Sequence, residues 1–160
     1  MSGPVSIRPV RDEDGAPVAA LIAACFAEYE NCPYNPEEFP ELQAPAAWYA
    51  PKGTRMWVAE AAGDIVGCIC GTPRPSGNIE LHKFYVAAPL RGSGLADRLH
   101  GLVEALATGI DAPAIVLWSD VRFARAHRFY EKRGYRRTGE TRDMFDYTEA
   151  FFRLDRAPAP

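Results

Sequence analysis

The segment LRGSGLADRL, residues 90–99, combines residue types that can bind a phosphate or a diphosphate. Gly92 and Gly94 stand just before an apolar pattern typical of a helix, whose first amides are unpaired and carry the positive end of the helix dipole. Glycine leaves these amides open to an anion, and Arg91 adds a permanent charge on a forked donor. We interpret the segment as a diphosphate site, with a simple turn between strand and helix as the alternative.

Two other kinds of phosphate loop fit this segment less well. A nucleotide-hydrolase loop needs a Lys followed by Ser or Thr, which the segment lacks, and Asp97 replaces the third glycine of a dinucleotide loop. The pattern therefore favours a diphosphate ligand outside these two classes.

A carboxylate and an imidazole lie two residues apart in ELHKFYV, residues 80–86. Alternation along a strand predicts that Glu80, His82, Phe84 and Val86 share one face. Such a pair could move a proton at neutral pH, because the ordinary pKa of histidine is about 6.5. The alternative is an exposed Glu80 and a half-buried His82 that take no part in chemistry.

Seven strands and four helices are predicted to position these residues. Alternation and apolar runs predict strands at 5–10, 55–61, 64–71, 79–86, 114–118, 135–141 and 147–154. Apolar residues at helical spacing and cap residues predict helices after Asp12 or Asp14, at 45–49, after the glycine loop, and from a cap at Asp120 to a stop at Gly134.

Two segments in this arrangement carry a resemblance to a known family. The run KFYVAAPLRGSGLADRL resembles the acyl-coenzyme A binding signature of the GNAT N-acetyltransferase superfamily, whose key loop positions here are Arg91, Gly94 and Ala96. AHRFYEKRGY, residues 126–135, resembles the later motif of the same superfamily. Together with the order of elements, the resemblance extends from Val5 to about Leu154.

The resemblance implies a fold and a co-substrate. The fold would be an α/β (α+β) mixed sheet of about seven strands flanked by about four helices, splayed between the strands at 79–86 and 114–118. Acetyl-coenzyme A would lie in the splay, its pantetheine arm along the backbone of Phe84, Tyr85 and Val86. The loop that would hold its pyrophosphate comprises Arg91, Gly92, Ser93, Gly94, Leu95 and Ala96.

The resemblance also implies a direct attack of an amine on the thioester. Tyr130 matches the family tyrosine that protonates the departing thiolate, and its ordinary pKa of about 10 keeps it protonated at neutral pH. Glu80 is the preferred base, because some small-amine acetyltransferases of the family carry a similar Glu, Leu, His in which the glutamate takes the proton of the amine. His82 is the rival, because its ordinary pKa of about 6.5 suits proton transfer at neutral pH. Phe123 stands where many members have an asparagine, so an apolar contact with the cofactor replaces a polar one.

The acceptor is predicted to be a primary amine on a small cationic or amino-acid-like molecule. Residues 28–41 contain five glutamates and neither lysine nor arginine, which would attract a cationic amine if the segment walls the acceptor site. The alternative function is a module that binds an acyl-coenzyme A without turnover, as a sensor or partner.

Length and composition set the remaining expectations. The 160 residues are interpreted as one domain at 4–155 with a flexible tail at 156–160. A net charge of −3 gives no reason to expect nucleic acid or an anionic membrane as partner. Four cysteines without a CxxC pair predict no metal site, and the absence of a leader pattern predicts a cytoplasmic protein. The late strands are candidates for a homodimer interface.

Overall fold

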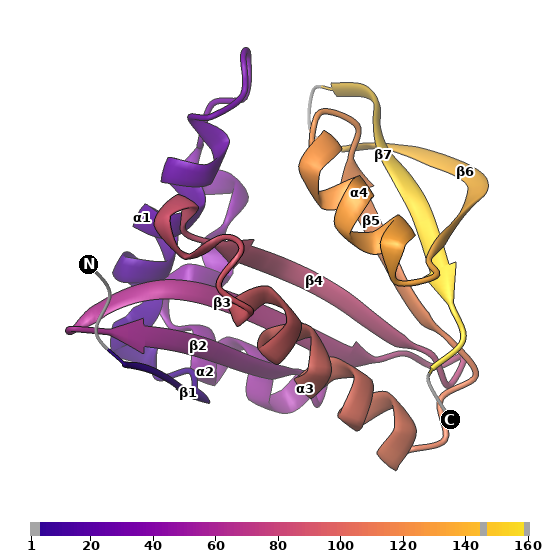
Figure 1. The fold of residues 1–160 in the computed structure, drawn as a ribbon, viewed down its shortest axis with the longest axis horizontal. Coiled ribbons are helices and arrows are strands. Elements are labelled where there is room, and N and C mark those ends of the chain that lie inside the picture. The colour runs from indigo at the N-terminus through magenta and orange to yellow at the C-terminus, as the bar shows by residue number, and fades with distance from the viewer. Residues whose placement is uncertain (1–3, 145–146, 159–160) are drawn as a thin grey trace.

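The computed structural model describes residues 4–144 and 147–158, which form a seven-stranded mixed sheet with helices on both faces (Figure 1). The strand order is β1-β2-β3-β4-β5-β7-β6. The strands are β1 Val5–Pro9, β2 Arg55–Ala61, β3 Asp64–Pro73, β4 Ile79–Val86, β5 Ile115–Asp120, β6 Arg136–Met144 and β7 Tyr147–Arg156. The helices are α1 Gly15–Phe26, α2 Pro45–Tyr49, α3 Leu95–Gly109 and α4 Ala124–Lys132. Short 3-10 turns cover Asp12–Asp14, Pro36–Glu38, Pro40–Gln43, Ala50–Lys52 and Ala88–Leu90. The predicted fold class is confirmed.

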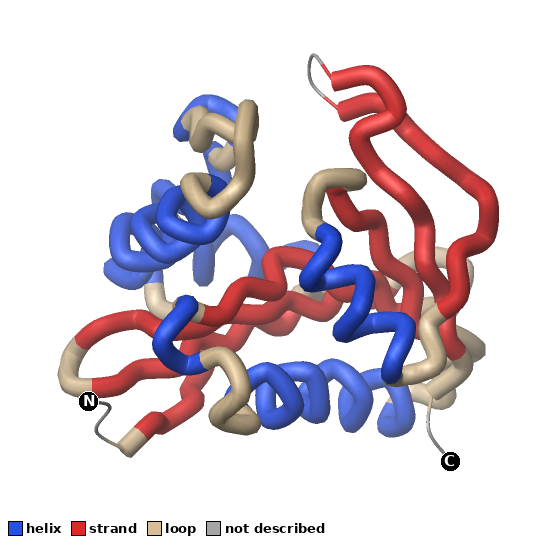
Figure 2. Tube along the Cα trace, turned by 45° about the horizontal axis from the view of Figure 1, so that its top comes forward, coloured by secondary structure: helices blue, strands red, loops and turns tan. Residues whose placement is uncertain are grey.

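The sheet is splayed between β4 and β5, as predicted. These strands are parallel and pair only at their starts, Ile79 with Ile115 and Glu80 with Val116. Beyond this point they diverge, and β6 and β7 lean away with β5 (Figures 1 and 2). The edge of β4 that faces the gap is therefore unpaired beyond Glu80, among the strands of the described residues.

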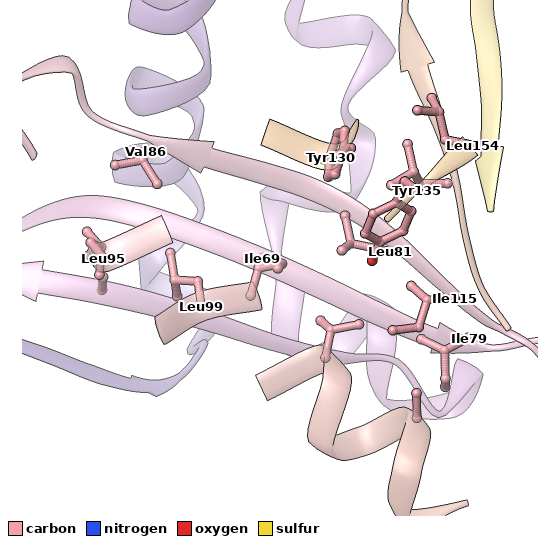
Figure 3. Packing of buried hydrophobic residues seen from close by; sticks show 14 of the residues in the cluster. Ile69, Ile79, Leu81, Val86, Leu95, Leu99, Ile115, Tyr130, Tyr135 and Leu154 are labelled. Atoms are coloured by element: carbon pink, nitrogen blue, oxygen red, sulfur yellow. The ribbon is translucent and has the colours of Figure 1, made fainter. Parts of the chain in front are cut away.

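Two apolar layers hold the sheet. One side packs against α3 through Leu95, Leu99 and Val103, which share a cluster with strand residues such as Ile69 and Leu81. Figure 3 shows Leu95, Leu99, Ile69 and Leu81 in this layer. The other side packs against α1 and α2 in a second cluster. Cys68 and Cys70, two residues apart on β3, both belong to that second cluster and are buried free thiols.

A β-bulge in β4 changes which side chains share a face. Cys68 pairs with Tyr85 and Cys70 with His82, so two residues of β4 oppose one of β3, and Lys83 takes a φ of 50°. His82 accordingly contacts the ring of Tyr49 on the α2 side. Beyond the bulge, Phe84 and Val86 pack into the α3 layer instead. The prediction that Glu80, His82, Phe84 and Val86 share one face is thus wrong for the last two.

The aspartates predicted to cap helices bind other partners. Asp14 directly precedes α1, but its carboxylate accepts hydrogen bonds from Arg8 at 2.7 and 2.9 Å and from the Arg11 amide. Asp12 instead accepts from the Ala47 amide at 2.9 Å, in the first turn of α2. Asp12 therefore bonds to the first turn of α2 and not to α1, the helix that it was predicted to cap.

Asp120 likewise does not cap α4. It is the last residue of β5, and its carboxylate accepts from the amide and the guanidinium of Arg122. The helix begins at Ala124, with Phe123 at the cap position and no side-chain hydrogen bond there. The stop at Gly134 agrees with the prediction, since α4 ends at Lys132 and Gly134 has a φ of 89°.

Several strands run two or three residues beyond their predicted ends. The extensions of β3, β5 and β7 are paired, for example Pro73 with Ile79 and Asp120 with Phe151, so neighbouring strands stabilise them. β7 reaches Arg156, within the predicted tail, where the guanidinium pairs with Glu104 and donates to the Arg133 carbonyl. Residues 159–160 of that tail lie outside the described residues.

Candidate functional site

Two clefts meet at the splay between β4 and β5. The first cleft, of about 290 Å³, extends from the glycine loop along α4. The second cleft, of about 310 Å³, extends from β4 towards β5 and β6. The residues that line both are Phe84, Tyr85, Phe123, Ala126 and Tyr130. Molecules bound in the two clefts would therefore meet beside these side chains.

The glycine loop forms one end of the first cleft, where Arg91, Gly92 and Ala96 line the wall. Gly92 and Gly94 have φ values of 78° and 92°, and a Cβ on either would meet nothing within 4 Å. Among the described residues, nothing accepts a hydrogen bond from the amides of Gly92, Gly94 or Ala96. Free amides before a helix, open space and a guanidinium fit a diphosphate.

Ser93 and Leu95 hold this loop in place. The Ser93 hydroxyl donates to the Leu90 carbonyl and accepts from the Leu95 amide at 3.4 Å. The Leu95 side chain is 2% exposed and packs in the α3 layer. Neither side chain lines the first cleft, so any contact with a ligand would come from the backbone.

Glu28 forms ion pairs with two arginines beside the glycine loop. Its carboxylate forms a two-pronged ion pair with Arg91, at 2.5 and 2.7 Å, and also contacts Arg125 at 3.2 Å. Hydrogen bonds from Arg91 hold the pKa of Glu28 below its ordinary value. The sequence assigned Glu28 to an acceptor wall; the structure gives it a position beside the loop.

Apart from Arg125, the remainder of the first cleft is lined by apolar and aromatic residues. Tyr29, Phe84, Phe123 and Phe129 line it, and Phe123 contacts the rings of Tyr29 and Phe26. An apolar channel that ends in a cluster of free amides suits a long chain with a phosphate end. Of the predicted cofactor residues, Phe84, Tyr85, Val86, Arg91, Gly92, Ala96 and Phe123 line the first cleft.

Glu80 lies in the second cleft and is partly neutralised. Arg74 contacts its Oε1 atom through Nε at 2.7 Å and Nη2 at 2.5 Å. No described residue bonds to Oε2, and the side chain is 15% exposed. Glu80 thus keeps one carboxylate oxygen that can accept a proton from a ligand.

His82 also lines the second cleft but is held as a neutral group. Its Nε2 atom lies 2.7 Å from the Thr72 hydroxyl, which lies 2.7 Å from the Thr54 hydroxyl. Burial, with Lys83 and Arg74 nearby, lowers the pKa of His82 to about 3. At neutral pH this imidazole is a weak proton acceptor.

Tyr130 stands where the two clefts meet. It is 6% exposed, and its ring lies 6.3 Å from that of Phe84 and 5.3 Å from that of Tyr135. Figure 3 shows the side chains of Tyr130 and Tyr135 within the buried cluster. Burial raises its pKa well above the ordinary value, so the hydroxyl carries its proton at neutral pH. No described residue forms a hydrogen bond with that hydroxyl.

The acidic segment contributes less to the second cleft than its composition indicates. Glu38 and Glu41 line this cleft, and Glu41 pairs with Lys83. Basic and aromatic side chains that sequence reasoning missed line it too. They come from distant strands, so no local spacing marks them: Trp118, Arg142 and Phe151.

Residues 4–144 and 147–158 contain neither a cluster of metal-binding side chains nor a membrane-spanning helix. No three His, Cys, Asp or Glu side chains there are grouped to hold a metal ion. None of the helices in that part of the chain is both long and apolar enough to span a membrane.

Known proteins resemble this chain in sequence and in fold. Residues 21–135 match the profile of the Acetyltransferase (GNAT) family. An N-acetylaspartate synthetase from Danio rerio is 35% identical over 99 residues, covering 61% of this chain and 35% of that protein. N-acetyltransferase 8 from Rattus norvegicus is 30% identical over 100 residues, covering 59% of this chain and 45% of that protein. The chain thus matches less than half the length of these curated relatives.

Solved structures share the fold at low sequence identity. A GNAT-family acetyltransferase from Staphylococcus aureus Mu50 has a TM-score of 0.83 at 19% identity, over 98% of this chain and 100% of the other. The PaiA N-acetyltransferase from Thermoplasma acidophilum, solved in complex with coenzyme A, has a TM-score of 0.72 at 13% identity, over 96% and 99% of the two chains.

Proposed function

Because the chain belongs to the acetyltransferase (GNAT) family, a family of acyltransferases, we propose that it moves an acetyl group from acetyl-coenzyme A to a primary amine. The acceptor is a small cationic or amino-acid-like molecule. The observation that most supports this proposal is the position of Tyr130, where the cleft that begins at the glycine loop meets the cleft that holds Glu80.

In this proposal, the first cleft binds acetyl-coenzyme A. The free amides of the glycine loop and Arg91 hold the diphosphate, and the unpaired edge of β4 bonds to the amides of the pantetheine arm. The coenzyme A named in the Thermoplasma acidophilum structure supports this assignment, because that protein has the same fold. Acetyl-coenzyme A supplies the activated acyl group, and its thioester would lie near Tyr130.

Glu80 and Tyr130 carry the proposed proton transfers. Glu80 accepts the proton that the amine must lose, through Oε2 or a bridging water, and the neutral amine attacks the thioester carbonyl. Backbone amides of β4 near Val86 donate to the developing oxyanion. The C–S bond then breaks, and Tyr130 gives its proton to the departing thiolate.

The structure favours Glu80 over His82 as the base. His82 engages Thr72 through Nε2, and its pKa of about 3 makes it a poor proton acceptor at neutral pH. Glu80 has an oxygen without a partner among the described residues. Curated relatives named N-acetylaspartate synthetase and N-acetyltransferase 8 agree with transfer to an amine, and the first name agrees with an amino acid as acceptor.

The test is release of free thiol from acetyl-coenzyme A in the presence of a panel of small amines. We expect thiol release with at least one amine, and mass spectrometry should find the matching N-acetyl product. Binding of coenzyme A without thiol release for any amine would instead support the non-catalytic acyl-coenzyme A module.

Paired variants separate the two candidate bases in the same assay. Glu80→Gln should lower kcat at neutral pH by about a hundredfold or more, with partial recovery at higher pH as the free amine becomes neutral. His82→Gln, which keeps a polar partner for Thr72, should retain most of the rate. The opposite ranking would make His82 the base.

A further inference from the structure

The second cleft contains charged side chains that nearly all have partners. Glu80 pairs with Arg74, Lys83 with Glu41, and Asp120 with Arg122. Among the described residues that line this cleft, only Glu38 and Arg142 have no ion pair within 4 Å. The cleft therefore offers one unpaired carboxylate and one unpaired guanidinium to a ligand.

Aromatic rings position the guanidinium of Arg142. Its central carbon lies 4.3 Å from the centre of the Trp118 ring and 5.8 Å from that of Phe151, so residues of β5 and β7 support a side chain of β6. No described residue forms a hydrogen bond with it. A cation–π contact does not use the N–H groups of the guanidinium, so they remain available as donors.

Glu80 and Arg142 share the second cleft and act on each other electrostatically. Partial desolvation lowers the pKa of Arg142, which nevertheless stays charged at neutral pH. A forked donor in such a place matches the two oxygens of a carboxylate. A polycation, in contrast, would be repelled by it.

We propose that Arg142 binds a carboxylate of the acceptor, so that the acetylated amine belongs to an amino acid rather than to a carboxylate-free amine. This inference rests on the proposed function. With its carboxylate at Arg142, the acceptor keeps its amino group for Glu80 and Tyr130, which line the same cleft.

The experiment compares amino acids with the amines formed by removing their α-carboxylate. The probes are L-alanine with ethylamine, L-aspartate with β-alanine, and L-lysine with cadaverine. For the best pair, we expect kcat/KM at least tenfold higher for the amino acid. Arg142→Gln should raise the KM of the amino acid by about ten- to a hundredfold and leave the KM of acetyl-coenzyme A unchanged.

Arg137→Gln is the matched control. Arg137 lies on the same strand and stacks on Phe152 at 4.2 Å, but it lines neither cleft. Arg137→Gln should keep the higher kcat/KM that the native protein has for the amino acid of the best pair. Equal kcat/KM for both members of every pair, or a preference that survives Arg142→Gln, would overturn the proposal.

Equilibrium binding keeps this inference separate from the proposed function. Calorimetry with L-alanine, L-aspartate and L-lysine on protein saturated with coenzyme A should give binding that Arg142→Gln weakens at least tenfold. Binding of this kind without thiol release would leave the carboxylate site intact and refute the proposed turnover. Absence of binding and of turnover for every amino acid would refute the inference.

Discussion

Individual residues with the same sequence signal differ in what their surroundings let them do. Glu80 and His82 are two positions apart, yet one keeps a carboxylate oxygen without a partner and the other is bonded to Thr72 and held neutral. The side-chain types were visible in the sequence. The low pKa of His82 was not, because its burial and its hydrogen bond with Thr72 depend on the fold.

Tyr130 allows a prediction about proton transfer to the departing thiolate. Tyr130→Phe removes the proton donor but keeps the ring, so kcat should fall by about a hundredfold or more while the Kd of coenzyme A changes little. Stopped-flow thiol release and calorimetry measure the two quantities.

Tyr135→Phe is the control for this change. The Tyr135 hydroxyl lies 2.8 Å from His100 Nε2, and Tyr135 lines neither cleft. Its loss should reduce the free energy of unfolding by about 1 kcal/mol and leave kcat near the native value. Equal kcat losses in the two variants would remove Tyr130 from the chemistry.

His82 provides a prediction for stability against pH. Its folded pKa of about 3 lies below the ordinary value of about 6.5, so the unfolded chain binds a proton that the native protein does not in this window. The free energy of unfolding should therefore fall as the pH drops below about 6.5, and this loss is absent above it.

His82→Gln isolates this contribution. Native protein should be more stable than the variant at pH 7, and the difference should narrow towards about pH 4.5 because only the native chain carries the depressed histidine. Urea unfolding at several pH values measures it. Parallel curves would mean that His82 titrates normally in the folded state.

At the scale of elements, the order and type of the strands and helices could be predicted because their signals are local. Alternation, apolar spacing, glycines and prolines lie within each segment. The bulge at Lys83, in contrast, has no local signal, and it moved Phe84 and Val86 to the other face. Asp14 and Asp120 have the residue type of a helix cap, but their carboxylates pair with Arg8 and Arg122, six and two residues away. The cap signal does not show which of two local partners a carboxylate takes.

The glycine loop allows a prediction at this scale. Gly92→Ala forces an L-residue to a φ of 78° and puts a methyl group into the open space by the free amides. We expect a stability loss of about 1–2 kcal/mol and a rise in the Kd of coenzyme A of about tenfold or more. Thermal unfolding and calorimetry test the two effects.

Gly139→Ala separates backbone strain from ligand contact. Gly139 has a φ of 88°, lies in β6 and lines neither cleft, and a Cβ there also meets nothing within 4 Å. Gly139→Ala should lower the free energy of unfolding as Gly92→Ala does, without changing the Kd of coenzyme A. A similar Kd increase in both variants would mean that the loop acts through stability alone.

At the scale of the whole molecule, the splay divides the sheet into two parts, and among the described strands these parts pair only at Ile79–Ile115 and Glu80–Val116. β1 to β4 form one part, and β5 with β6 and β7 forms the other. Strand order made this arrangement predictable once the family resemblance was present. The second cleft was less predictable, because Trp118, Arg142 and Phe151 come from three strands and meet only in the folded sheet.

Hydrogen exchange should reveal this division. Because few backbone bonds join the two parts, the amides of β6 and β7 should exchange as a group before those of β2 and β3. Coenzyme A, bound along the gap, should slow exchange in β4, α4 and β5 together. Equal protection of both parts without ligand, or slowing confined to the glycine loop, would contradict this expectation. Exchange measured by mass spectrometry on peptides from each strand distinguishes these outcomes.

The contact of Glu28 with Arg91 and Arg125 has a consequence for binding kinetics. The Glu28 carboxylate offsets part of the positive charge of the two guanidinium groups, so the net charge at the loop is small. A diphosphate that binds there takes the place of this carboxylate beside the guanidinium groups. Long-range attraction depends on net charge and is screened by salt, which limits how strongly this loop accelerates encounter. Ligands that differ in their phosphate groups should then be distinguished by how slowly they leave rather than by how quickly they arrive.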